Sequence, residues 1–406
     1  MLLKKISAAY FTLALTVVVD AFGPEEVAFF FSLLGLFLSA LFFRSSGNGR
    51  FSYVWYLYAA SFFVSFLIGI YSNPFVSVVK DSWYFVKPVV YFFFGVFLSK
   101  VLSPSKVFLL LISVSVLACV VYIAPILFSG DWLSMNADDL RDKHGQGSYL
   151  FVIGLIGLGC VEWSRKYRFL QVGLLLFFLL TILLSSSRIL LLFVLVYLLL
   201  EFFPSTGKSK LVQCGLILLF AFAALPSYDT QTQEGERESF IDKVEFTLSE
   251  IRPKLYLSDW DVHQRWRGYE TYMAVEEYLS GGVGNYVFGY GVGKSVSIDF
   301  AKRSRTGDAS LFELEWLHNG YITALLKGGV LGLIALLWVL LALLNLPLNL
   351  ADRLSRCQMY LCYLMIISTF FLGGIFNKSD VLVPMWLIGY LSARMYQSSM
   401  SHQVKC

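Results

Sequence analysis

The stretch Trp316-Leu317-His318-Asn319-Gly320-Tyr321 opens an apolar run that continues to Leu344 and contains Gly328, Gly329 and Gly332. A run of this length is typical of a helix that crosses a membrane. Glycines inside such a helix allow its neighbours to approach closely. The sequence therefore predicts a polar His-Asn pair at the water-facing end of a tightly packed membrane helix.

The composition of the whole chain agrees with this prediction. Of the 406 residues, 57% are hydrophobic and 15% are charged, whereas about 25% of the residues of a soluble domain are charged. Apolar runs recur along most of the chain, so we expect an all-α integral membrane protein. The net charge of +4 gives no reason to expect nucleic acid as a partner.

Cysteine usage and the N-terminus add two smaller expectations. The six cysteines form no metal-ligand pairs, and none lies in the polar segment 228–316, so no disulfide is expected there. The start, Met1 to Lys5 followed by an apolar segment, has no small-residue cleavage site after it. We interpret it as a retained first helix.

The apolar runs predict about twelve transmembrane helices. Residues 1–227 would carry the first nine, 228–316 a large loop with short helices, and 317–406 the last three. The expected spans are about 6–22, 27–43, 52–71, 83–102, 107–128, 147–163, 168–184, 188–203, 211–227, 317–344, 357–376 and 381–397.

Basic residues alternate between the connections and so predict the orientation. Pairs such as Lys4/Lys5, Lys208/Lys210 and Arg353/Arg356 fall on one side of the predicted membrane. Positively charged loops mark the cytoplasm, so both termini are expected there. The segment 228–316 would then face the periplasm of a bacterial inner membrane.

The large loop contains two helical patterns, at about 239–251 and 262–280. In the second, Trp266, Tyr269, Met273 and Tyr278 are spaced for one face, and Gly281-Gly282 predicts its end. We expect a small helical cap on the outer face of the membrane helices.

Three polar motifs outside the His-Asn pair are candidates for chemistry. Ser187-Arg188 opens a predicted span, so Arg188 is either a snorkelling anchor or an anion-binding arginine at a helix N-terminus. Arg265 and Arg267 form either a solvated helix face or an anion site. Gly289-x-Gly291-x-Gly293 forms either a tight turn or a backbone nest for an anion; no βαβ unit surrounds it, which argues against a dinucleotide.

His318 is the fourth candidate. A single histidine at a span boundary is usually structural, but His144, His263 and the arginines are all predicted on the same side. Since no second His or carboxylate stands four residues away, no metal is expected at His318.

The order of these motifs resembles the O-antigen polymerase and O-antigen ligase family, over roughly residues 150–345. The resemblance implies a GT-C-like inverting glycosyltransferase that needs neither metal nor cofactor. It also implies catalytic roles for Arg188, Arg265 and His318. Substrate-binding roles fall to Arg267, Asn319, Ser187, Gly289, Gly291 and Gly293.

Two features depart from the family pattern. The residues before the loop glycines are Asn285-Tyr286-Val287, where the family usually includes a proline. The presence of both Arg265 and Arg267 leaves open which arginine takes the key role.

The implied partners are an undecaprenyl-diphosphate-linked glycan donor, an acceptor glycan or lipid A-core, and the lipid bilayer; a polymerase would add a chain-length regulator. Guanidinium groups bind phosphate oxygens bidentately and stabilise the charge of a leaving diphosphate. An imidazole suits removal of a proton from the acceptor hydroxyl.

The favoured function is polymerisation of lipid-linked repeat units into O-antigen or a related surface polysaccharide. The alternative within the family is the ligase that moves finished glycan onto lipid A-core. A polysaccharide flippase or other transporter would predict charged residues deep in several spans and pseudo-symmetric halves, and the sequence pattern indicates neither. A purely structural membrane protein would leave the clustered arginines and His318 unexplained.

Overall fold

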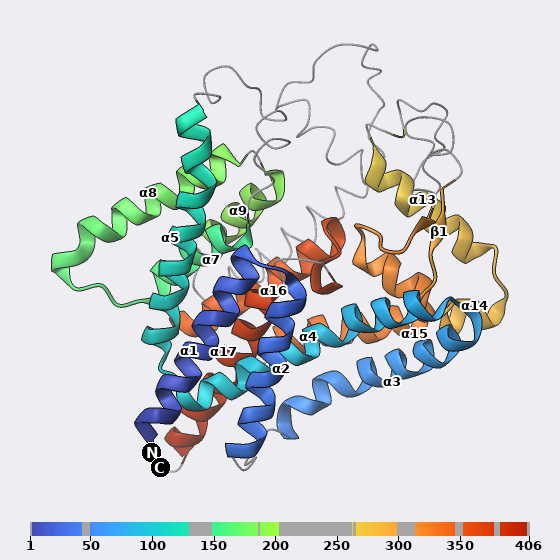
Figure 1. Ribbon diagram of the computed structural model, residues 1–406, viewed down its shortest axis with the longest axis horizontal. Coiled ribbons are helices and arrows are strands. Elements are labelled where there is room, and N and C mark those ends of the chain that lie inside the picture. The colour runs from blue at the N-terminus through green and yellow to red at the C-terminus, as the bar shows by residue number, and fades with distance from the viewer. Residues whose placement is uncertain are drawn as a thin grey trace.

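The computed structural model describes residues 2–42, 49–129, 148–185, 187–202, 262, 265–298, 313–345, 352–376 and 382–403. This part of the chain is almost entirely helical, with a single pair of very short strands (Figure 1). The α-helices are α1 (Leu2–Phe22), α2 (Glu25–Phe42), α3 (Gly49–Ser72), α4 (Phe75–Val101), α5 (Pro104–Ser129), α7 (Tyr149–Cys160), α8 (Arg168–Leu184), α9 (Arg188–Phe202), α13 (Trp266–Leu279), α14 (Val283–Phe288), α15 (Gly320–Leu344), α16 (Arg353–Phe371) and α17 (Leu382–Gln403). The remaining elements are the 3-10 helices η2 (Arg165–Tyr167) and η5 (Gly374–Phe376) and the antiparallel strands β1 (Val296–Ser297) and β2 (Glu313–Leu314).

Six helical segments in the described residues are long and apolar enough to cross a membrane. Their outer surfaces are apolar as well: on α8, Phe169 is 93% exposed and Leu176 is 60% exposed. Soluble proteins rarely leave such a contiguous surface uncovered, so a multi-helix membrane protein is supported. The six segments are Phe51–Ser72, Phe75–Val101, Pro104–Phe128, Arg165–Leu184, Gly320–Leu344 and Arg353–Phe371.

Every predicted span except the ninth coincides with a helix. The ninth, at about 211–227, lies outside the described residues, as does the predicted loop helix at 239–251. The second loop helix is confirmed as α13. The number of crossings and the orientation stay predictions, although the start of α1 and the end of α17 lie at the same edge of the molecule in Figure 1.

The most extensive helix contact, between α4 and α17, depends on two reciprocal glycines. A Cβ on Gly95 would overlap the backbone carbonyl of Trp386, and a Cβ on Gly389 would overlap that of Phe92. Close approach through small residues is how membrane helices gain van der Waals contact in the absence of a hydrophobic driving force. Phe92 and Trp386 at this crossing are fully buried.

Helix α15 packs against α3, and it is broken at Gly329, whose φ is 64°. The span predicted at about 317–344 is present as a candidate membrane span, and its helix is interrupted at this residue. A non-helical residue interrupts the hydrogen-bond ladder, and the loop after α14 replaces it. The Tyr290 N–H donates to the Leu326 carbonyl at 2.9 Å, and the Gly291 N–H donates to the Lys327 carbonyl at 3.0 Å.

Gly329→Ala is expected to destabilise this junction. A Cβ there would meet the backbone of Val287 and lie 2.5 Å from the Gly289 nitrogen, at a φ that L residues rarely adopt. Gly328→Ala is the matched control, because its Cβ would meet only the Ser61 hydroxyl at 3.7 Å. In thermal unfolding of the purified protein in detergent, only the first change should lower the midpoint by several degrees. An equal response of both variants would contradict this packing.

Candidate functional site

His318 is held by a buried carboxylate from α13. The imidazole Nδ1 lies 2.8 Å from Oε2 of Glu270, and the backbone N–H of His318 donates to the same oxygen at 3.2 Å. The Glu270 side chain is only 2% exposed, whereas that of His318 is 45% exposed. One ring nitrogen is therefore fixed inside the protein while the rest of the ring faces the exposed side.

The backbone before His318 is anchored from several directions. The Trp316 ring packs edge-on against Tyr84 of α4 at a centroid distance of 4.5 Å, and Leu317 is buried. The His318 carbonyl accepts a hydrogen bond from the N–H of Gly373, just after α16. These contacts hold the backbone that carries the imidazole.

Asn319 caps the N-terminus of α15. Its side-chain Oδ1 accepts from the N–H groups of Tyr321 at 3.0 Å and Ile322 at 3.2 Å, as a helix-capping asparagine does. Capping accounts for an asparagine next to His318 and sets where the helix begins. A contact of Asn319 with substrate stays a prediction.

Arg265 immediately precedes α13 and is buried, and Arg267 in the first turn is half-buried. The Arg265 carbonyl accepts from the N–H of Tyr269 at 3.0 Å. Since a helix rises 1.5 Å per residue, Arg265 and Glu270 are separated by about 7.5 Å along the axis. One short helix therefore carries both the predicted phosphate-binding arginine and the carboxylate that holds His318.

The predicted inward face of α13 is confirmed. Tyr269 and Tyr278 are buried, and Trp266 and Met273 are half-buried. These side chains pack into two small clusters with the start of α15 and the strands. The contacts fix α13 against the membrane helices.

Gly289, Gly291 and Gly293 form a tight turn in which each glycine has a positive φ, of 74°, 83° and 88°. Their N–H groups donate to the Asn285 carbonyl, the Lys327 carbonyl and the Asp81 carboxylate, respectively. Of the two alternatives, a tight turn or a backbone nest, the structure shows the tight turn: these three amides donate to protein acceptors and form no nest for an anion. A direct substrate contact by the glycines stays a prediction, and this geometry favours the packing role.

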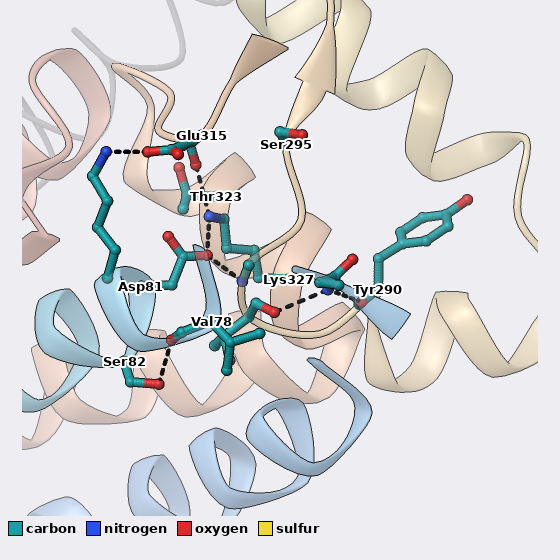
Figure 2. A network of polar contacts seen from close by, with 12 residues as sticks. Val78, Asp81, Ser82, Tyr290, Ser295, Glu315, Thr323 and Lys327 are labelled. Carbon is teal, nitrogen blue, oxygen red and sulfur yellow. Dashed lines mark hydrogen bonds and ion pairs between the residues drawn. The ribbon is translucent and has the colours of Figure 1, made fainter. Parts of the chain in front are cut away.

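A buried ion pair lies beneath this turn. Lys327 Nζ of α15 pairs with Asp81 of α4, both side chains being 1% exposed, and also donates to the Glu315 carbonyl at 2.7 Å. Figure 2 shows Lys327 pointing between Asp81 and Glu315, with Tyr290 of the glycine turn beside them. The Glu315 side chain pairs in turn with Lys80. The chain of contacts joins α4, α15, the glycine turn and the segment that leads to His318.

This ion pair corrects two sequence-based expectations. The fourth span was expected to begin at about residue 83, but α4 begins at Phe75, so that Asp81 lies inside the helix and is buried. Charged residues were not expected deep in the spans, yet Asp81, Lys87 and Lys327 are all buried in candidate spans. Lys87 Nζ lies 4.6 Å from the centroid of the Tyr84 ring.

Arg188 is the first residue of α9, as predicted, and Ser187 before it is buried. The Ser187 carbonyl accepts from the N–H of Leu191 at 3.1 Å. Helix α9 packs against α7 and α16, and α16 also packs against α15. The position of the Arg188 side chain lies outside the described part, so its meeting with Arg265 and His318 stays a prediction.

Glu270, Asp81 and Lys327 are the residues that sequence reasoning missed. His144 and His263 lie outside the described residues. Within the described ranges, no group of three or more His, Cys, Asp or Glu side chains is placed to hold a metal ion.

Compared with known proteins, the chain matches no family model and no curated protein sequence.

Proposed function

We propose that this chain is a metal-independent, inverting glycosyltransferase that polymerises undecaprenyl-diphosphate-linked repeat units into O-antigen or a related surface polysaccharide. The observation that carries the proposal is the Glu270–His318 pair at the start of an apolar helix. It offers an exposed, oriented imidazole at the end of a candidate membrane span, where a lipid-linked sugar would present its head group. The motif order that resembles the polymerase and ligase family adds to it.

The proposed reaction uses His318 as the general base. Its imidazole takes the proton of an acceptor hydroxyl, and that oxygen attacks the anomeric carbon from the face opposite the diphosphate. The bond from the anomeric carbon to the diphosphate oxygen breaks, undecaprenyl diphosphate leaves, and the configuration is inverted. Arg188 and Arg265, with Arg267 beside them, would stabilise the charge that grows on the leaving group.

A lipid-linked donor also suits the surface of α15. Beyond the break at Gly329, Val330, Ile334 and Leu341 recur along the helix and are about half exposed. A polyprenyl chain or bilayer lipid can cover such a stripe, because neither requires hydrogen bonds from it. The membrane-embedded part of the donor and its reacting sugar would then meet the same helix.

The buried charges bear on the transporter alternative. Ionisable residues inside a membrane often mark transport pathways, and the presence of Asp81 and Lys327 removes one argument against a transporter. Both groups, however, have protein partners on neighbouring elements, including Gly293 and Glu315. A structural role in holding the site accounts for the pair, so the transferase remains the favoured function.

A gene deletion tests polymerase against ligase. Without the polymerase, ligation continues while polymerisation stops, so cells should display lipid A-core with a single repeat unit. Reintroducing the wild-type gene should restore long chains, and the His318→Ala gene should not. Complete loss of surface glycan with accumulation of long carrier-linked polymer would assign the ligase instead.

A further inference from the structure

We infer that Glu270 is the positioning residue of His318: it fixes the imidazole in the tautomer with the proton on Nδ1 and leaves Nε2 as the base. The inference deepens the proposed function and rests on it for its catalytic part. The geometric part concerns only the imidazole and its partner. The two parts can therefore be tested separately.

The hydrogen-bond pattern decides the tautomer. Oε2 of Glu270 already accepts the backbone N–H of His318 at 3.2 Å, which identifies it as an acceptor. An ionised carboxylate can only accept hydrogen bonds, so beside it the contact at 2.8 Å is filled by a proton on Nδ1. The lone pair then lies on Nε2.

Burial of Glu270 fixes the position of its carboxylate relative to the imidazole of His318. Glu270 is nearly inaccessible, and Tyr269 and Ala274 of the same helix are buried in two separate hydrophobic clusters. A carboxylate held in this way cannot follow the ring if the ring turns.

A merely structural role is the competing explanation, because Glu270 also ties α13 to the start of α15. Two substitutions separate the roles. Glu270→Gln keeps a carbonyl oxygen at the same distance, and the backbone N–H of His318 favours the orientation that presents it. Glu270→Met keeps the length of the side chain and removes the acceptor.

The first arm of the experiment is nitrogen-15 NMR of histidine-labelled full-length protein in lipid nanodiscs, with His318 assigned by comparison with His318→Gln. Wild type and Glu270→Gln should show the Nδ1–H tautomer, and Glu270→Met should show a shift towards Nε2–H. Glu276→Gln, an exposed glutamate on the same helix, is the matched control and should behave as wild type. An unchanged Nδ1–H tautomer in Glu270→Met would overturn the inference.

The second arm measures the rate of glycan transfer. Glu270→Met should lose on the order of 10²–10⁴ in rate, as a missing base would. Glu270→Gln should lose about tenfold, since a neutral acceptor replaces a charged one.

Equal losses of transfer rate in the Gln and Met variants would assign Glu270 to structure alone. Absence of transfer by the wild-type protein would overturn the proposed function. The tautomer measurement would then still decide whether Glu270 positions His318.

Discussion

Lys327→Met is expected to destabilise the protein by about 3–5 kcal/mol, because it leaves the Asp81 carboxylate buried without its cation. Asp81 is 1% exposed, so water cannot replace the lost partner. Two further contacts of Lys327, with the Glu315 carbonyl and over the Trp316 ring at 4.4 Å, disappear in the same variant. Thermal unfolding in detergent, followed by size-exclusion chromatography, measures the change.

Two control variants distinguish the effect of breaking the buried ion pair from the effect of removing a charged side chain in general. Lys80→Met breaks an exposed pair in the same network, and exposed pairs contribute about 1 kcal/mol or less. Asp81→Asn combined with Lys327→Met removes both charges and should recover much of the lost stability. If Lys80→Met proved as damaging as Lys327→Met, burial would not be the source of the effect.

His318→Ala is expected to reduce glycan transfer by on the order of 10²–10⁴, because it removes the proposed general base. Binding of undecaprenyl diphosphate should remain, since the proposed diphosphate contacts come from arginines. Arg265→Lys, in contrast, should weaken the binding of undecaprenyl diphosphate nearly as much as Arg265→Ala does, because the lysine ammonium lacks the planar, two-pronged geometry of a guanidinium group.

A binding assay with undecaprenyl diphosphate, run beside a transfer assay, separates these effects. His402→Ala, near the end of α17, serves as the matched histidine control and should leave both properties unchanged. Loss of donor binding in His318→Ala would contradict the division of labour.

Apolar runs in the sequence placed most of the helices correctly because membrane helices satisfy their backbone hydrogen bonds locally. The predicted span 168–184 coincides with α8, and the loop pattern at 262–280 contains α13. The residue pattern that predicts each of these helices lies within the helix itself. The same reasoning placed His318 and Asn319 at the start of α15.

The features that sequence reasoning missed are all contacts between distant segments. Asp81 and Lys327 are 246 positions apart, and Glu270 and His318 are 48 apart. Neither pair has the spacing of neighbours on one helix, so no local sequence pattern predicts either contact. The break at Gly329 has the same origin, since the glycine turn after α14 occupies the space that a side chain would need.

The central claim is tested most directly by giving the purified protein, reconstituted in lipid vesicles, undecaprenyl-diphosphate-linked repeat units in the presence of a metal chelator. We predict longer glycans on the carrier, release of undecaprenyl diphosphate with each addition, and an inverted configuration at the new bond. His318→Ala should add on the order of 10²–10⁴ fewer units per unit time. Failure of the wild-type protein to consume the donor, or equal elongation by well-folded His318→Ala, would contradict the account.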